Sequence, residues 1–172
     1  RSTLSSSSAA SDVYKRQVRG YGKSEGKPTH IGIAEDGPEI LNWVLKQKNF
    51  KNHELIIYGA SMGTQIATHL SSQFPEKVQL LILDGPMTSF TDIALHSAAE
   101  EQKAIIQQFV TSPYSAKEDI QQIKNTPVLI IHSEGDTAVP LSQGQELYKL
   151  ASEPKEIWEY EGEHLEAAKK FP

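Results

Sequence analysis

The sequence predicts an α/β fold, in which a doubly wound parallel β-sheet is covered by helices on both faces. Short apolar runs, typical of strands buried on both sides, alternate along the chain with stretches in which apolar residues recur at helical spacing. No internal repeat interrupts this alternation. Ligands of such sheets bind at the carboxyl ends of the strands, so the loops that follow each strand are the places to search for a site.

Four strands are predicted from apolar runs that end in turn-forming residues. They cover Leu55–Tyr58, Val78–Leu83, Val128–Ile131 and Glu156–Tyr160, the last of them partly exposed. Helical spacing is found between and after these runs. It covers residues 40–45, 66–74, 91–110, 116–124 and 141–151, and a final helix is expected from Leu165 onward.

Composition narrows the class of protein. The chain has 172 residues, of which 38% are hydrophobic and 23% charged, as expected for one globular domain. Its net charge of −5 argues against a general nucleic-acid binder. The absence of cysteine excludes disulfides, thiol catalysis and cysteine-bound zinc. No apolar run approaches the roughly 20 residues that span a bilayer. The compartment and membrane association stay open, with a cytoplasmic location favoured.

The first residues differ from the remainder. Residues 1–12 are rich in serine and alanine without periodicity, and Ser11–Gln17 resembles leaders that arise as sequencing or assembly artefacts. A native flexible tail is the alternative. We therefore treat residues 1–17 as a non-native or disordered leader and expect the domain to span residues 18–172.

A nucleophile motif follows the first predicted strand. Gly59-Ala60-Ser61-Met62-Gly63 matches G-x-S-x-G, with a strand directly before it and a helix directly after it. Such a sharp turn holds the serine in a strained conformation with its hydroxyl above the sheet, and the glycines are expected to supply room. The Met62 N–H, at the start of the helix, is the predicted oxyanion donor. A tight turn with an incidental serine is the alternative.

An acid and a base follow two later strands. Asp136 comes after the strand Val128–Ile131, and His164 comes after Glu156–Tyr160. The order serine, aspartate, histidine and the position of each at a strand end allow one sheet to bring them together. His164 would take the proton of Ser61, and Asp136 would orient the imidazole. The alternatives are a turn or helix-cap aspartate and a surface-loop histidine, with Asp84 as a rival acid.

Two further features resemble parts of functional sites. His132 ends a strand near Asp136 and could line the site, although core packing or a backbone hydrogen bond is favoured for it. Since no histidine pair has the spacing of a metal site, we predict no metal. Gly22-Lys23-Ser24 resembles part of a phosphate-binding loop, but Gln17 stands where that loop needs glycine, so nucleotide binding is rejected.

These segments together resemble the α/β-hydrolases, specifically serine hydrolases of the ABHD or Bem46-like type. The resemblance rests on Arg19–Gly26, the turn at Ser61, Leu83–Pro86, Pro127–Pro140 and Gly162–His164, and it spans about residues 18–172. It implies a Ser61–Asp136–His164 triad, no organic cofactor or metal, and a small helical cap or lid within residues 87–125.

The resemblance also implies a reaction. Family members mostly cleave carboxylic esters, including acyl-glycerols, lipid esters and thioesters. The resemblance therefore implies an esterase, lipase or thioesterase that acts on a small-molecule acyl ester through an acyl-enzyme. A serine peptidase on the same fold, or an inactive hydrolase-fold scaffold, is the alternative. The family sheet has eight strands, and we expect its first strands, together with the loop that gives the second oxyanion N–H, to be missing from this N-terminally truncated chain. The fragment by itself is then expected to be weakly active or inert.

Overall fold

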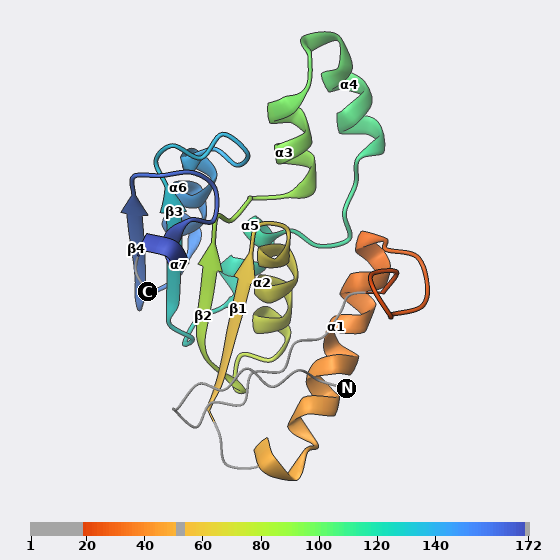
Figure 1. The fold of residues 1–172 in the computed structure, drawn as a ribbon, viewed down its shortest axis with the longest axis vertical. Helices are drawn as coiled ribbons and strands as arrows, with labels where there is room; N and C mark the ends of the chain where they lie inside the picture. The colour runs from red at the N-terminus through yellow and green to blue at the C-terminus, as the bar shows by residue number, and fades with distance from the viewer. Residues whose placement is uncertain (1–18, 51–53, 171–172) are drawn as a thin grey trace.

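Four parallel strands form one sheet in the order β1-β2-β3-β4 (Figure 1). This arrangement comes from a computed structural model that describes residues 19–50 and 54–170. The strands are β1 (Leu55–Ala60), β2 (Val78–Asp84), β3 (Val128–Ser133) and β4 (Lys155–Tyr160). The predicted α/β fold with a parallel sheet is confirmed. The predicted leader, residues 1–17, lies outside the described residues.

The helices alternate with the strands as predicted. They are α1 (His30–Leu45), α2 (Gly63–Gln73), α3 (Phe90–Ser97), α4 (Glu100–Phe109), α5 (Ala116–Asp119), α6 (Leu141–Leu150) and α7 (Ala167–Lys170), with 3₁₀ turns η1 (Lys48–Phe50) and η2 (Ile120–Gln122). The start of α1 is fixed by Thr29, whose hydroxyl accepts the Gly32 N–H at 3.1 Å.

Two helix predictions were wrong in detail. Residues 91–110 form two helices, because Ala98 and Ala99 adopt extended backbone with ψ of 146° and 153°. The Gln102 side chain then accepts the Ala99 N–H at 3.3 Å and starts the second helix. The final helix begins at Ala167 because Leu165 has a φ of +59°, which no right-handed helix accommodates.

The core lies between one face of the sheet and the helices α2, α5 and α6. The strands contribute leucine, valine and isoleucine side chains, and the helices with their flanking turns contribute alanine, isoleucine and leucine. The buried cluster consists of Ala67, Leu81, Leu83, Ala116, Ile120, Ile123, Val128, Ile130, Leu147 and Ala151. Helix α7 lies over the other face, where it borders a cavity of about 750 Å³ lined also by Tyr58, Asp84 and Trp158.

Helices α3 and α4 form a hairpin that stands clear of the sheet (Figure 1). None of the residues of either helix is buried. The chain segments directly before and after the hairpin are held together by the buried side chain of Gln65 on α2. Its amide nitrogen donates to the Met87 carbonyl at 2.6 Å, and its amide oxygen accepts the Ala116 N–H at 3.0 Å. The hairpin therefore leaves and rejoins the body of the protein at one place.

Candidate active site

The turn from β1 into α2 presents Ser61 in an uncommon backbone conformation. Ser61 has a φ of +51°, in the left-handed region that non-glycine residues rarely adopt. The conformation is held because the Ser61 N–H donates to the Asp84 carbonyl at 2.8 Å and the Thr64 N–H donates to the Ser61 carbonyl at 3.0 Å. A strained residue that is held from both sides is typical of functional sites. The strained strand-to-helix turn expected from the sequence is present.

The two glycines of the motif differ in their surroundings. A Cβ atom on Gly59 would lie 2.6 Å from the Ala67 Cβ and 2.7 Å from the Gly63 carbonyl oxygen. Gly59 therefore lets α2 approach β1 closely, as predicted. A Cβ on Gly63 would meet nothing within 4 Å, so the prediction that Gly63 supplies room within the turn was wrong.

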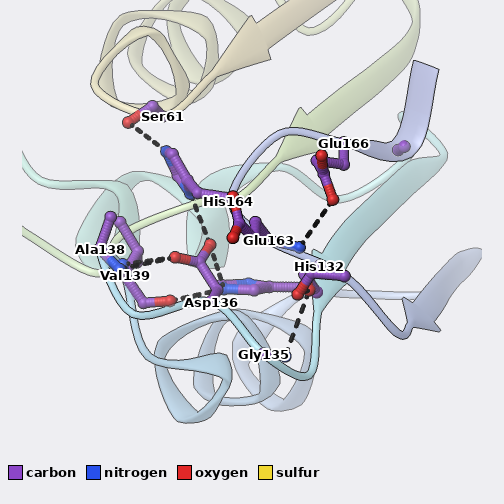
Figure 2. Close-up of polar contacts among 12 residues, drawn as sticks. Ser61, His132, Gly135, Asp136, Ala138, Val139, Glu163, His164 and Glu166 are labelled. Carbon is purple, nitrogen blue, oxygen red and sulfur yellow. Dashed lines mark hydrogen bonds and ion pairs between the residues drawn. The ribbon is translucent and has the colours of Figure 1, made fainter. Parts of the chain in front are cut away.

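His164 lies between Ser61 and Asp136 (Figure 2). Its Nε2 is 2.9 Å from the Ser61 hydroxyl oxygen, and its Nδ1 is 2.5 Å from Asp136 Oδ2. A carboxylate only accepts hydrogen bonds, so the network assigns the ring proton to Nδ1. The lone pair on Nε2 is then directed at the hydroxyl of Ser61. The structure brings the three predicted residues together in one chain of hydrogen bonds.

Asp136 is held by the loop that contains it. Its side chain is fully buried, and its Oδ1 accepts the N–H groups of Ala138 at 2.9 Å and Val139 at 2.8 Å (Figure 2). These two donors fix one oxygen, so the other faces the imidazole.

His132 lies behind the acid and has a fully buried ring. Its Nε2 is 2.9 Å from the Val139 carbonyl oxygen and 3.5 Å from Asp136 Oδ2, and its buried Nδ1 has no partner among the described residues. Because a carbonyl accepts but never donates, the network assigns the ring proton to Nε2. The predicted backbone hydrogen bond of His132 is confirmed, and it ties β3 to the loop that holds Asp136.

The rival acid Asp84 does not face the imidazole. Its Oδ2 accepts the hydroxyl of Tyr58 at 2.8 Å, and its backbone carbonyl supports Ser61. Burial, reinforced by the neighbouring Asp84 carboxylate, raises the pKa of Tyr58, so this hydroxyl stays protonated and keeps donating. Gly85 is the residue that approaches the histidine. It has a φ of +56°, and a Cβ there would lie 2.8 Å from His164 Cε1.

Met62 occupies the N-cap position of α2 with helical backbone angles. No described residue accepts its N–H, and its side chain is exposed. This N–H belongs to the group of unpaired donors found at every helix start, where the helix dipole favours negative charge. The geometry is therefore compatible with the predicted role of Met62 as an oxyanion donor.

Three residues that support the site were not predicted from the sequence. The sequence indicates only a turn at Gly85, although a glycine directly after a buried strand can also signal that another part of the chain approaches the backbone closely. The hydroxyls of Ser133 and Tyr160 contact the loop that carries His164, and no motif marks them.

Across residues 19–50 and 54–170, no group of three or more histidine, aspartate or glutamate side chains is placed to hold a metal ion. Within the same part of the chain, no helix is both long enough and apolar enough to cross a membrane.

Comparison with known families gives a match over more than half of the chain. A family model for the alpha/beta hydrolase fold matches residues 12–108. The chain belongs to the α/β-hydrolase family. Bem46 of Schizosaccharomyces pombe is 30% identical over 144 residues, which cover 84% of this chain and 48% of Bem46. The lysophosphatidylserine lipase ABHD12 of Danio rerio is 28% identical over 168 residues, covering 88% of this chain and 42% of ABHD12.

Solved structures show a similar fold. An esterase of Pyrococcus furiosus, Pf2001, superimposes with a TM-score of 0.67 at 22% identity, covering 90% of this chain and 63% of the esterase. At this identity the likeness shows the fold alone. The chain spans about half the length of the curated relatives it matches. Among α/β-hydrolases it groups with the ABHD and Bem46-like proteins.

Proposed function

We propose that the protein is a serine hydrolase that cleaves carboxylic ester or thioester bonds through an acyl-enzyme on Ser61. The observation that carries this proposal is the continuous chain of hydrogen bonds from Ser61 through His164 to Asp136, at 2.9 and 2.5 Å. A serine hydroxyl is a poor nucleophile at neutral pH, and an adjacent oriented base is the arrangement that activates it.

The proposed reaction has two halves. His164 Nε2 accepts the proton of Ser61 as the hydroxyl oxygen attacks the carbonyl carbon of the substrate. The resulting oxyanion accepts the Met62 N–H, and the buried Asp136 carboxylate stabilises the imidazolium. As the tetrahedral intermediate collapses, His164 protonates the leaving alcohol or thiol. Water then attacks the carbonyl carbon of the acyl-enzyme while His164 Nε2 accepts a proton from it. His164 returns this proton to the Ser61 oxygen as the bond to Ser61 breaks and the carboxylic acid leaves.

The relatives and the hairpin support a proposal for the substrate class. ABHD12 is named for its action on lysophosphatidylserine, which supports an acyl ester of lipid type as the substrate. The α3–α4 hairpin rises from the edge of the sheet at which β1 turns into α2 (Figure 1). We assign it, within the predicted region 87–125, as the cap that selects substrates. Amides use the same triad, so a serine peptidase is the second reaction to be tested.

Replacement of the nucleophile tests the proposal. In the natural full-length protein, Ser61→Ala should lower kcat for p-nitrophenyl butyrate by about 10⁵–10⁶-fold and abolish labelling by a fluorophosphonate probe. The matched control is Ser72→Ala on the same helix, because the Ser72 hydroxyl donates to the His69 carbonyl at 2.8 Å, away from the triad.

Three outcomes separate the alternatives. Loss of activity and labelling in Ser61→Ala alone supports the serine hydrolase. Unchanged hydrolysis in Ser61→Ala refutes it, and absence of both labelling and hydrolysis in the unmodified protein indicates a scaffold without activity. Comparison of p-nitrophenyl esters with peptide anilides then distinguishes an esterase from a peptidase.

A further inference from the structure

The loop that carries His164 is held by two hydroxyl groups at the ends of neighbouring strands. Ser133 is the last residue of β3 and Tyr160 is the last residue of β4, and the two are paired in the parallel register of the sheet. Side chains of paired residues point to the same face. Both hydroxyls therefore reach residues 161–167, which comprise the connection between β4 and α7 and the first residue of α7.

Tyr160 makes three hydrogen bonds to this segment through one oxygen atom. Its O–H donates to the Glu163 carbonyl at 3.2 Å, and the same oxygen accepts the N–H groups of Glu166 at 2.9 Å and Ala167 at 3.1 Å. A hydroxyl has one donor and two acceptor sites, so its capacity is fully used. These contacts fall on both sides of His164, one before it and two after it.

The contacts of Tyr160 replace a helix cap. The first N–H groups of a helix have no partner within the helix, and here the tyrosine oxygen accepts those at the start of α7. Tyr160 is only 7% exposed, and burial raises the pKa of its hydroxyl, so the group keeps its proton and continues to donate at neutral pH.

Ser133 holds the opposite end of the segment. Its hydroxyl donates to the Gly162 carbonyl and accepts the Gly135 N–H at 3.2 Å, so it joins the His164 loop to the loop that leads into Asp136. Ser133 is almost completely buried. The base and the acid therefore share one anchor.

The segment needs such anchors because its backbone is strained at the critical point. Leu165, directly after His164, has a φ of +59°. A branched side chain in this region is unfavourable and persists only where the surroundings enforce it. Relaxation of Leu165 would rotate the peptide next to His164 and change the direction of the imidazole.

We infer that Tyr160 and Ser133 are positioning residues that hold the His164 imidazole in line between Ser61 and Asp136. This inference rests on the proposed function, in which His164 is the base. The hydrogen bonds of these two hydroxyls go to backbone groups and not to His164 or Ser61. Each acts through the backbone of residues 162–167, so its loss should affect the rate of the proton transfer and leave substrate binding intact.

The test uses Tyr160→Phe in the natural full-length protein, which keeps the ring and removes only the hydroxyl. We expect kcat for p-nitrophenyl butyrate to fall about 10–100-fold, with KM within about twofold, because a displaced base costs rate at this order. Fluorophosphonate labelling of Ser61 should slow in parallel. The control is Tyr148→Phe on α6, whose ring packs on the core and whose hydroxyl has no hydrogen-bond partner among the described residues.

The folded fraction of each variant is measured by circular dichroism, and all rates are expressed per folded molecule. Each result then has one interpretation. Wild-type kcat in Tyr160→Phe, together with an inactive Ser61→Ala, overturns the positioning role and leaves the proposed function standing. Full activity in Ser61→Ala overturns the proposed function itself. If Tyr160→Phe does not fold, Ser133→Ala provides the test, and an unchanged kcat in that variant also overturns the inference.

Discussion

Gly59 and Gly63 flank Ser61, yet alanine at these two positions should affect stability in opposite directions. At Gly59, the added methyl group would lie 2.6 Å from the Ala67 Cβ, 2.7 Å from the Gly63 carbonyl oxygen and 2.9 Å from the Thr64 Cα. Two of these three atoms belong to the backbone of α2 and cannot move aside independently. At Gly63 the methyl group would meet nothing within 4 Å.

The magnitudes follow from these distances. Overpacking of this kind costs about 1–3 kcal/mol, and the rigid neighbours place Gly59→Ala near the upper end. Alanine in place of an exposed helical glycine stabilises by about 0.5–1 kcal/mol, which applies to Gly63→Ala at the start of α2. For a protein of this size, 1 kcal/mol corresponds to about 2–4 °C in Tm.

Urea unfolding of the two variants beside the unmodified protein measures this difference. We expect the midpoint of Gly59→Ala to fall and that of Gly63→Ala to rise slightly, with the slope of the transition unchanged in both. Displacement of α2 by Gly59→Ala should also shift Ser61 and lower esterase activity. Equal stability of the two variants, or a larger loss in Gly63→Ala, would refute the assignment of the close approach to Gly59.

Three further results are expected. Asp136→Asn preserves the shape of the acid and removes its charge, so kcat should fall about 10³–10⁴-fold with little change in folding; a loss below tenfold would contradict its role. His132→Asn removes a buried hydrogen bond to the Asp136 loop, and urea unfolding should show a loss of about 1–3 kcal/mol. Burial alone would raise the pKa of Asp92, but hydrogen bonds from Lys117 and other neighbours outweigh it, so this pKa lies below its ordinary value of 3.8. The charged Asp92 carboxylate therefore stabilises the fold above pH 3.8, and this stabilisation is lost as the pH falls through the lower pKa that Asp92 has in the folded protein. In acid, the urea midpoints of Asp92→Asn and of the unmodified protein should therefore converge.

The strands, and the hydrogen-bonded arrangement of Ser61, His164 and Asp136, could be predicted because their signals are local. Leu55–Tyr58 and Val128–Ile131 are continuous apolar runs, which predict strands of a parallel sheet. The prediction that Leu55–Tyr58 is buried was wrong for one face of β1, where Ile56 and Tyr58 are more than half exposed. The order of Ser61, Asp136 and His164 along the chain, each at a strand end, then placed all three at one edge of the sheet. Only the distances had to come from the structure.

Other features depend on contacts between distant segments. The periodicity of residues 91–110 is helical throughout, and the break at Ala98 and Ala99 follows no glycine or proline. Gly63 matched a motif position, but whether it has a close neighbour depends on how α2 packs. The role of Tyr160 could not be predicted from a motif. It depends on a hydroxyl that accepts hydrogen bonds from backbone N–H groups six and seven residues later in the chain.

Gln65 has a consequence for how substrate preference changes in proteins of this architecture. The Gln65 amide group makes hydrogen bonds to Met87, before the hairpin begins, and to Ala116, after it ends. The hairpin is therefore an insertion whose two ends are fixed at one place. The entropy of closing a loop grows by only about 0.6 kcal/mol for each doubling of its length. Under the proposed function, in which the hairpin is the cap, a shorter or longer hairpin grafted between these two residues should therefore change which substrates reach Ser61 while the turn from β1 into α2 stays as it is.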